Sequence, residues 1–250
     1  MKEPTKLIDA FVLATQARVF KKKFKSLRAN SSFEHIHTLR VNIRQMRSIL
    51  WLYKKSNSEF RFRSLSHLLS KVSRQLGKVR TLDVAIQDSK KFRIRNKVLL
   101  KKRNLAEMSL QKMTSHKKRQ QLNQKLLRAL KKLESYPQSR LKAGVLELQA
   151  RVRQWKYNKH QNPKELHRLR KIVKKTRYTL EAFARPVPSL EKLQEHLGRG
   201  HDFDALQTYL GKNKKVEQAA KRRYRLAQRE KTLVLKSAIQ NLNQIQKSIH

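Results

Sequence analysis

Apolar residues recur at intervals of three and four along most of the chain, which is the period that an α-helix requires. Two of these sets lie far apart in the sequence: Ile36, Leu39, Ile43, Met46 and Leu50, and Leu166, Leu169, Val173, Thr176 and Leu180. Glycine and proline are scarce, with five of each in 250 residues. The chain therefore has too few turn-forming residues for a many-stranded sandwich or barrel. The pattern predicts an all-α fold.

Prolines and capping residues divide the first half of the chain into four helical units. Ser31 and Glu34 form a capping box for the second unit. We expect a break or bend at Gly77, and Pro137 ends the last unit. The predicted helices cover about 4–27, 31–55, 59–76 and 91–135, with a short segment after Thr81.

The same order repeats in the second half. Asn162, Pro163 and Glu165 supply an N-cap, a first-turn proline and a capping-box acid. Ser189 is expected to open the following helix, and Gly198 is expected to interrupt it. The predicted helices cover about 139–157, 162–185, 189–210 and 212–249.

The two halves also match residue by residue, which indicates an internal duplication. Residues 37–53 align with residues 167–183 without a gap, and residues 76–84 align with residues 197–205. The first pair of blocks carries matched basic positions: His37, Arg40, Arg44 and Arg47 in one half, and His167, Arg170, Lys174 and Arg177 in the other. We therefore predict two four-helix halves, 1–136 and 137–250, that together form one domain.

Steps of three, four and three residues place the basic positions of each block on one narrow strip of helix surface, about 15 Å long. The strip borders the apolar face instead of lying opposite it. It is therefore expected to line a cleft between packed helices, where the cations reach water or are neutralised by anions. Guanidinium groups bind phosphate oxygens in pairs, and Lys and His add a compact charge and a directed donor. A linear polyphosphate satisfies this chemistry.

The blocks HTLRVNIRQMR and HRLRKIVKKTRY, each followed by LGKVRTLDV or LGRGHDFDA, resemble the CHAD family, the conserved histidine α-helical domain. The resemblance spans nearly the whole chain. It implies two four-helix bundles related by pseudo-two-fold symmetry, with a basic groove or pore that binds inorganic polyphosphate through the eight basic residues named above. It also implies a cytoplasmic protein able to reside on polyphosphate granules. Thr81 departs from the pattern, because the family more often has Asp there.

The charge balance supports a polyanionic partner, since 62 Lys and Arg against 17 Asp and Glu give a formal net charge of +45. The chain has no cysteine, hence no disulfide framework, and no run approaches the roughly 18 apolar residues that suggest a membrane span. It contains no phosphate-binding glycine loop, no dinucleotide fingerprint and no HExxH motif. The start, MKEPTK, lacks the ExExK motif of a triphosphate-processing domain that is fused to some relatives of the family. We expect binding without catalysis and without a cofactor.

Three other interpretations stay open. Nucleic acid is the strongest rival partner, because a net charge of +45 binds DNA or RNA by counterion release, and Trp51 continues the basic strip where a base could stack. A scaffold on a membrane surface or an acidic protein would use the basic runs 21–25, 112–119 and 221–225. Asp83 and Asp204 occupy matching places, with His201 and Asp202 nearby, and form a candidate metal site. Such aspartates more commonly cap a helix or pair with a neighbouring Arg, and Arg80 and Arg199 are the neighbours available.

Overall fold

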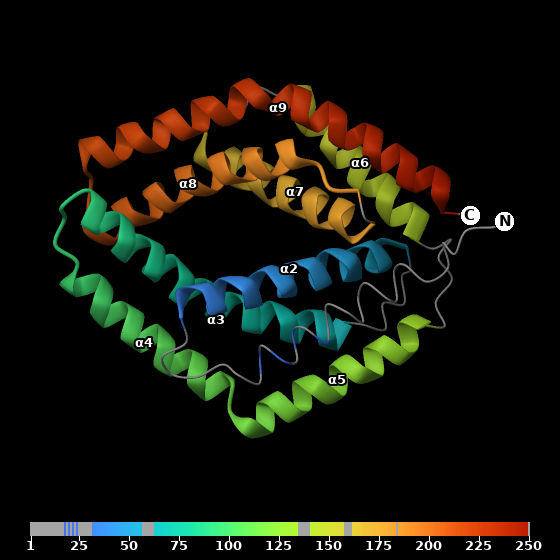
Figure 1. Ribbon diagram of the computed structural model, residues 1–250, viewed down its shortest axis with the longest axis horizontal. Helices are drawn as coiled ribbons and strands as arrows, with labels where there is room; N and C mark the ends of the chain where they lie inside the picture. Colours follow the sequence, from blue (N-terminus) through green and yellow to red (C-terminus); the bar gives the residue numbers. More distant parts are fainter. Residues whose placement is uncertain are drawn as a thin grey trace.

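The computed structural model describes residues 18, 20, 22, 24, 32–56, 63–134, 141–157, 162–183 and 185–249. These ranges contain helices and no strand, which confirms the predicted all-α fold (Figure 1). The helices are α2 (Phe33–Ser56), α3 (Arg63–Lys91), α4 (Lys97–Met113), α5 (His116–Glu134), α6 (Leu141–Tyr157), α7 (Pro163–Ala182), α8 (Pro188–Leu210) and α9 (Lys214–Ser248). None of these helices is long and apolar enough to span a bilayer.

The predicted first helix, 4–27, and the basic run 21–25 lie outside the described residues except at four positions. Two of these positions, Phe20 and Phe24, are buried, and their stacked rings have centroids 5.0 Å apart. A spacing of four residues places two side chains on the same helix face. The segment therefore contributes an apolar pair to the core.

Side-chain caps begin α2 and α7. The backbone N–H of Glu165 donates to Asn162 Oδ1 at 2.9 Å, so the predicted Asn162 cap is confirmed. At the start of α2, the backbone N–H of His35 donates to Ser32 Oγ at 3.2 Å. The predicted cap, Ser31, lies outside the described residues. In both places a side-chain oxygen satisfies a backbone donor that the helix cannot satisfy itself.

The two glycines expected to break helices lie inside continuous ones, so both predicted breaks are wrong. Gly77 lies within α3, and Gly198 lies within α8. Glycine costs about 1 kcal/mol relative to alanine in a helix interior. The apolar stripe nevertheless continues through each site, with Leu76, Val79 and Leu197 buried. Burial of that stripe outweighs the low helix propensity of one glycine.

The single helical stretch predicted over 91–135 is also wrong, because the chain turns twice there. Arg93 has a φ of 56°, in the left-handed region, between α3 and α4. Thr114 separates α4 from α5, and its hydroxyl donates to the carbonyl oxygen of Leu110 at 2.9 Å. Local side-chain bonds of this kind compete with helix continuation. Neither turn contains the glycine or proline that would have marked it in the sequence.

Helix α8 begins one residue before its predicted cap. Pro188 occupies the first turn, and Val187, in extended conformation, takes the cap position, so Ser189 is not the cap. A proline at this place loses no hydrogen bond, because its missing N–H would have had no partner in the helix. At the other end Gly211 has a φ of 87°, which glycine adopts without steric cost. Asn213 then caps α9.

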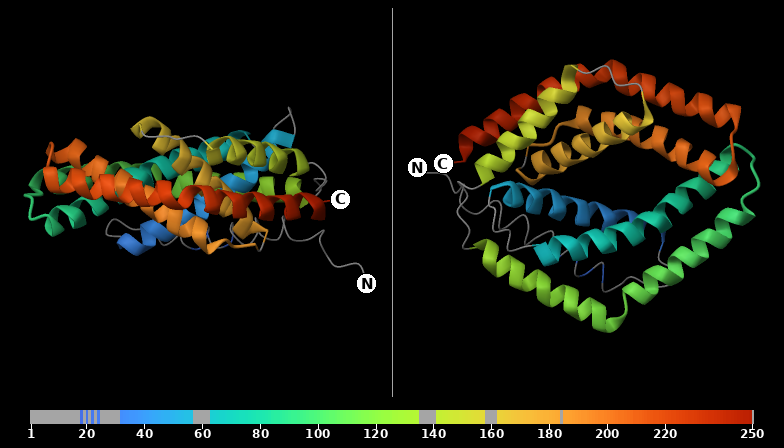
Figure 2. Two further views of the ribbon diagram at one scale, coloured as in Figure 1. Left: turned by 90° about the horizontal axis from the view of Figure 1, so that it is seen from above. Right: turned by 180° about the vertical axis from the view of Figure 1, so that it is seen from behind.

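Four long helices meet at the centre of the molecule: α2 contacts α3 and α7, and α8 also contacts α3 and α7. Helices α2 to α5 occupy the lower half of Figure 1 and α6 to α9 the upper half, with α4 and α5 at one edge and α9 at the other. Figure 2 shows that the assembly is flat when seen from above. The origin of this arrangement in two duplicated bundles stays a prediction.

The predicted apolar faces of α2 and α7 are buried in one core that runs through both halves. Ile43, Leu169 and Val173 are each 0% exposed. Helix α6 closes tightly on α2, because a Cβ atom at Gly144 would lie 2.5 Å from the carbonyl oxygen of Leu52. Only glycine permits that approach. The basic strips that border these faces are thereby held in fixed positions.

Candidate functional site

A cavity of about 230 Å³ lies where α2, α3, α7 and α8 meet. It brings together five of the eight predicted binding residues: His37, Arg40, Arg44, Arg170 and Lys174. The first three come from α2 and the other two from α7, and these two helices contact each other. These five side chains of the two basic strips therefore line a common space, whereas their role in binding stays a prediction.

Arg40, Arg170 and Lys174 are largely buried cations at the centre of this cavity. Burial and the charges of Arg44, Arg80 and Arg170 lower the pKa of Arg40 to about 9. Burial also lowers the pKa of Arg170, and burial together with Arg170 and Arg44 holds the pKa of Lys174 well below its usual value. Such shifts measure how strongly the surroundings oppose positive charge. The free cavity is short of negative charge.

Several buried polar atoms around the cavity have no hydrogen-bond partner in the part of the chain that the structure describes. They include Nε of Arg40, Nε of Arg170 and Nη1 of Arg80. A buried donor without an acceptor costs about 1–3 kcal/mol. An anion or ordered water in the cavity would supply the acceptors that these guanidinium groups need.

Two carboxylates, Asp202 and Glu195, line the cavity against six Lys and Arg side chains. Asp202 acts on several of these cations at once, since its charge partly offsets the lowered pKa values of Arg40, Arg170 and Lys174. Two carboxylates cannot neutralise six cations. The cavity therefore keeps a net positive charge that favours a polyanion.

Two further guanidinium groups at the cavity are held by their neighbours. Arg80 lies over the ring of Phe33, with its guanidinium carbon 3.3 Å from the ring centroid. Arg199 forms hydrogen bonds of 2.8 and 3.1 Å with the two carboxylate oxygens of Asp88. Side chains fixed in this way lose less conformational freedom when they bind a ligand.

Three histidines contribute uncharged donors. Burial and the charge of Arg80 lower the pKa of His37, and burial and Lys171 lower that of His167. Burial and Arg170 lower the pKa of His201 to about 4, and the rings of His167 and His201 have centroids 5.4 Å apart. Each neutral imidazole offers one N–H donor and one acceptor nitrogen.

Two further cavities adjoin the central one along α7. One, of about 460 Å³, lies between α7, α8 and α9, includes His167 and shares Arg170 and His201 with the central cavity. The other, of about 410 Å³, lies between α2, α3 and α7, includes Arg47 and shares Arg44 and Lys174 with it. Seven of the eight predicted residues therefore line three cavities that have lining residues in common.

The eighth predicted residue, Arg177, does not line these three cavities. Its Nε donates to Glu181 Oε1 at 2.6 Å, and its Nη2 lies 2.7 Å from Glu191 Oε1. Burial lowers the pKa of Arg177, but the hydrogen bond to Glu181 and the charges of both carboxylates raise it above its usual value. In contrast to Arg40 and Arg170, Arg177 already has negative partners and joins α7 to α8.

The two aspartates considered for a metal site have protein partners. Asp83 accepts a hydrogen bond from Arg103 Nε at 3.1 Å, and Asp204 accepts one from the Tyr224 hydroxyl. Asp83 is therefore hydrogen-bonded to Arg103, where its sequence neighbour Arg80 was the expected partner. Asp204 is likewise bonded to Tyr224, where Arg199 was expected. Burial raises the pKa of Asp204, and the bond from Tyr224 opposes that rise. No group of three metal-ligating side chains occurs among the described residues.

Sequence reasoning did not assign Arg80, Arg199, His201 and Asp202 to the polyanion site, although they line the central cavity. All four lie in the repeated blocks 76–84 and 197–205. Arg80 and His201 occupy equivalent places, three residues after Gly77 and Gly198, so each lies on the same helix face as its glycine. A hydrogen-bond donor repeated three residues after a glycine in both blocks was the signal available in the sequence.

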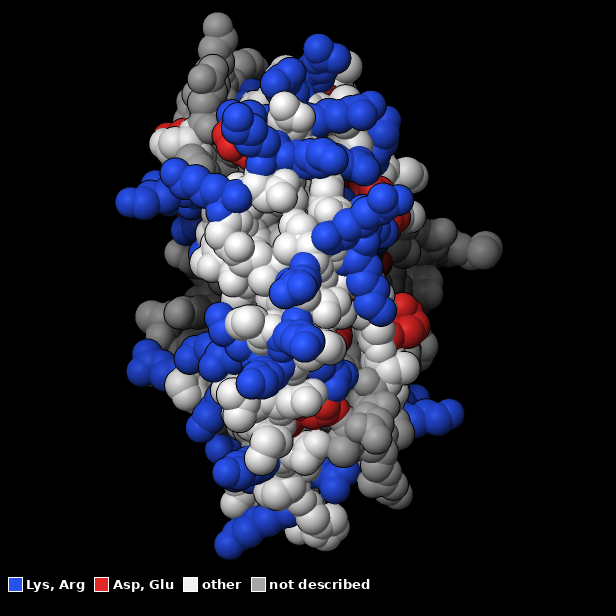
Figure 3. Space-filling view, turned by 90° about the vertical axis from the view of Figure 1, so that its left-hand side faces the viewer, with Lys and Arg blue, Asp and Glu red and all other residues white. Residues whose placement is uncertain are grey.

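Cations also dominate the surface away from the cavity. Figure 3 shows the end of the molecule where α3 leads into α4 and α8 into α9; Lys and Arg are spread above and below a band of uncharged atoms, and acidic groups are few. Scattered surface cations of this kind raise the rate at which a polyanion arrives. They do not by themselves select one polyanion.

The fold and the cavity define an all-helical protein with a cationic centre between its halves. The chain belongs to the CHAD family, because its residues 12–211 match the CHAD domain model. This confirms the resemblance found in the sequence.

Two solved structures share the fold. PptA from Streptomyces chartreusis has a TM-score of 0.60 and 15% identity, over 97% of this chain and 100% of its own. The CHAD domain from the plant Ricinus communis has a TM-score of 0.54 and 19% identity, over 95% of this chain and 91% of its own. Comparison with proteins of curated function gives no match.

Proposed function

We propose that the protein binds linear inorganic polyphosphate in the central cavity and does so without catalysis. The observation that carries this proposal is the cluster of Arg40, Arg170 and Lys174, largely buried cations whose pKa values are lowered by burial. A chain of phosphates brings negative charge and acceptor oxygens to the same narrow space. Family membership supports the same ligand, since the resemblance to the CHAD family implies polyphosphate binding.

The size of the cavity favours a chain of bare phosphates. The cavity of about 230 Å³ is lined mainly by cations and other polar side chains. A nucleic acid backbone carries a sugar and a base at every phosphate, and these groups need further room and apolar or aromatic contacts. Among the residues that line the central cavity there is no aromatic ring apart from His37 and His201. Polyphosphate has no such requirement.

Binding alone is proposed because the lining consists mainly of cations and hydrogen-bond donors. These groups hold phosphate oxygens, whereas hydrolysis also needs a group that positions and activates water. Asp202 is the acid most closely associated with the cluster, and it is engaged with the surrounding cations. On this proposal the protein acts in the cytoplasm and is able to reside on polyphosphate granules.

Replacing Arg40, Arg44, Arg170 and Lys174 together by alanine tests the cavity. Anisotropy of end-labelled long-chain polyphosphate should show tight binding to the natural protein and none to this variant, while far-ultraviolet circular dichroism stays helical. The matched control replaces four exposed cations of α4 and α5 by alanine: Lys101, Lys117, Lys125 and Arg128. Both variants lose the same charge. An equal loss of binding in both would contradict the proposal.

A competition experiment separates polyphosphate from nucleic acid. Labelled polyphosphate bound to the natural protein is challenged with single-stranded DNA, RNA and a nucleoside triphosphate at one ionic strength. We expect each to displace the label poorly when compared with unlabelled polyphosphate at equal phosphate concentration. Because electrostatic binding of every polyanion weakens with salt, the ionic strength is held constant. Preferential displacement by DNA or RNA would support the rival function.

A further inference from the structure

Helix α7 carries a second row of cations besides the strip that faces the central cavity. We call Lys164, Arg168, Lys171 and Lys175 the outer row. Their spacings of four, three and four residues place them on one narrow strip of the helix, about 16 Å long. Lys164, Arg168 and Lys171 are exposed, and none of the three pairs with a carboxylate in the described part of the chain. The row lies on the side of α7 away from its buried apolar face.

The equivalent positions on α2 carry no cation, which makes the two halves unequal. In the alignment of the two blocks these positions are Glu34, Thr38, Val41 and Gln45. Thr38 donates to the carbonyl oxygen of Glu34 at 2.9 Å, and Gln45 donates to Glu181 Oε2 at 3.3 Å. Glu34 would also repel a phosphate chain. Of the two central helices that line the cavity from opposite halves, α7 alone offers a second row for a polyanion.

The outer row also connects the cavities described above. Lys164, Arg168 and Lys171 line the 460 Å³ cavity, which shares Arg170 with the central one. Lys171 and Lys175 line the 410 Å³ cavity, which shares Lys174 with the central one. Lys171 therefore borders both outer cavities. Cations thus continue from the central cavity on to the exposed side of α7 in two places.

We propose that the outer row is a second polyphosphate site, which holds the part of a long chain that extends beyond the central cavity. The inference rests on the proposed function and adds a direction to it: the chain leaves the centre over α7 and not over α2. Short chains are held by the central cavity alone. Long chains gain additional charge-assisted hydrogen bonds from the outer row.

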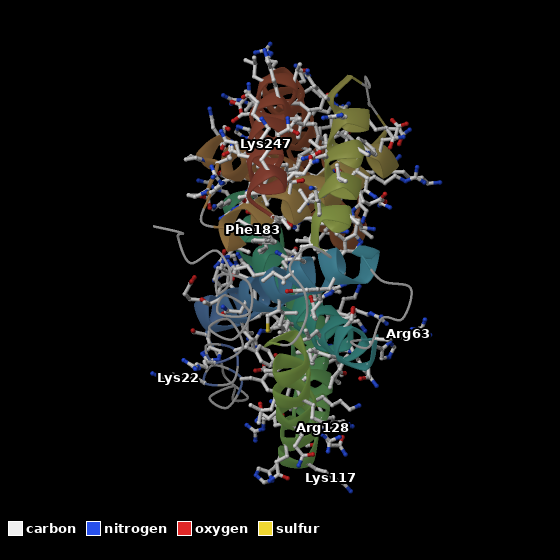
Figure 4. All side chains as sticks on the ribbon, turned by 90° about the vertical axis from the view of Figure 1, so that its right-hand side faces the viewer. Lys22, Arg63, Lys117, Arg128, Phe183 and Lys247 are labelled. Atoms are coloured by element: carbon white, nitrogen blue, oxygen red, sulfur yellow. The ribbon has the colours of Figure 1, made fainter. Side chains whose placement is uncertain are left out.

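The test replaces Lys164, Arg168 and Lys171 together by glutamine and keeps Lys175, whose ammonium lies 3.6 Å from the centroid of the Trp51 ring. The control replaces Lys117, Lys125 and Arg128 of α5 by glutamine, which removes the same charge. Lys117 and Arg128 project from α5 at the opposite edge of the molecule from α9 (Figure 4). Affinities for tripolyphosphate and for long-chain polyphosphate are measured by calorimetry for both variants and the natural protein.

The outer-row variant should bind tripolyphosphate within about twofold of the natural protein, because this ligand fits the central cavity. It should bind long chains about tenfold more weakly than the control variant does, as expected for the loss of three exposed ionic contacts. Equal weakening of long-chain binding in the two variants, or none in either, overturns the inference.

The outcome of the same measurements also distinguishes this inference from the proposed function. If the natural protein binds neither ligand, the proposed function fails and the outer row with it. If the natural protein binds both ligands and the outer-row variant behaves like the control, only the second site fails. Single-stranded DNA is titrated as a third ligand. If the outer-row variant loses affinity for this DNA but not for long polyphosphate, the row belongs to a nucleic acid site and the inference is wrong.

Discussion

Arg199 of α8 and Asp88 of α3 form an ion pair with two hydrogen bonds, of 2.8 Å from Nη2 to Oδ1 and 3.1 Å from Nη1 to Oδ2. Asp88 is 1% exposed. The guanidinium of Arg199 also lies 4.6 Å from the centroid of the Phe203 ring and lines the central cavity. One buried carboxylate thus joins α3 to α8 at the wall of the candidate site.

Replacing Asp88 by asparagine should lower the free energy of unfolding by about 2–3 kcal/mol, because Arg199 loses its charged partner in a partly buried place. Urea denaturation measures the change. The control is Glu147→Gln, since Glu147 pairs with Arg151 at 2.7 Å on an exposed part of α6. That variant should change stability by less than about 0.5 kcal/mol. Equal effects would show that the buried pair has no special role.

Replacing Lys174 by methionine should stabilise the free protein and weaken the complex. Methionine keeps most of the side-chain volume and removes a cation that burial and Arg170 oppose. Replacing buried ionic groups by apolar ones of similar size is often neutral or stabilising by about 1–4 kcal/mol. We expect a gain of about 1 kcal/mol in thermal unfolding experiments without ligand.

The same Lys174→Met variant should bind long-chain polyphosphate at least about tenfold more weakly, because it lacks a charged hydrogen-bond donor in the central cavity. Lys117→Met on α5 serves as the control, and it should alter neither property. A Lys174 variant that is less stable and binds normally would contradict the proposed site.

Stability of the free protein should depend on pH through His201. Burial and nearby cations lower the pKa of this ring from 6.5 to about 4 in the folded protein. The unfolded chain therefore binds more protons between these values, and stability falls as the pH drops through this window. Between pH 7 and pH 4 the melting temperature of the natural protein should fall further than that of His201→Asn. Parallel curves would argue against this role of His201.

Polyphosphate should weaken that dependence, because a bound anion raises the pKa of nearby imidazoles toward the value of the unfolded chain. Binding then takes up protons, and affinity rises as the pH falls, approaching tenfold for each imidazole whose pKa the anion raises by one unit once the pH lies below both values. Calorimetry in buffers of different ionisation enthalpy measures the proton uptake directly. Release of protons on binding would contradict the presence of the histidines beside the ligand.

Much of the fold could be predicted from local sequence patterns. The wrong predictions also have local causes. The buried faces of α2 and α7 and the Asn162 cap are encoded by residues close together in the chain, so they could be predicted. Gly77 and Gly198 misled the prediction because helix propensity is weak beside the packing of a long apolar stripe. The turn at Thr114 has no glycine or proline.

Some features of the candidate site could also be predicted from nearby residues, and others could not. The two strips, one with Arg40 on α2 and one with Arg170 on α7, are visible in the sequence because the spacing of each fits one helix face. The pairing of Arg177 with Glu181 was also accessible, since the two lie four residues apart on α7. The bond between Arg199 and Asp88 was not accessible, because 111 residues separate the partners and only the packing of α3 on α8 brings them together.

The surplus of cations in the central cavity also determines how the purified protein has to be handled. In dilute buffer, mutual repulsion among Arg40, Arg170 and Lys174 is least screened. We therefore expect sulfate or phosphate in a storage solution to stabilise the molecule more than chloride at equal ionic strength does. Affinities for polyphosphate measured in such solutions include the free energy needed to displace the small anion. Measured affinities can therefore be compared only when the buffer contains the same anion.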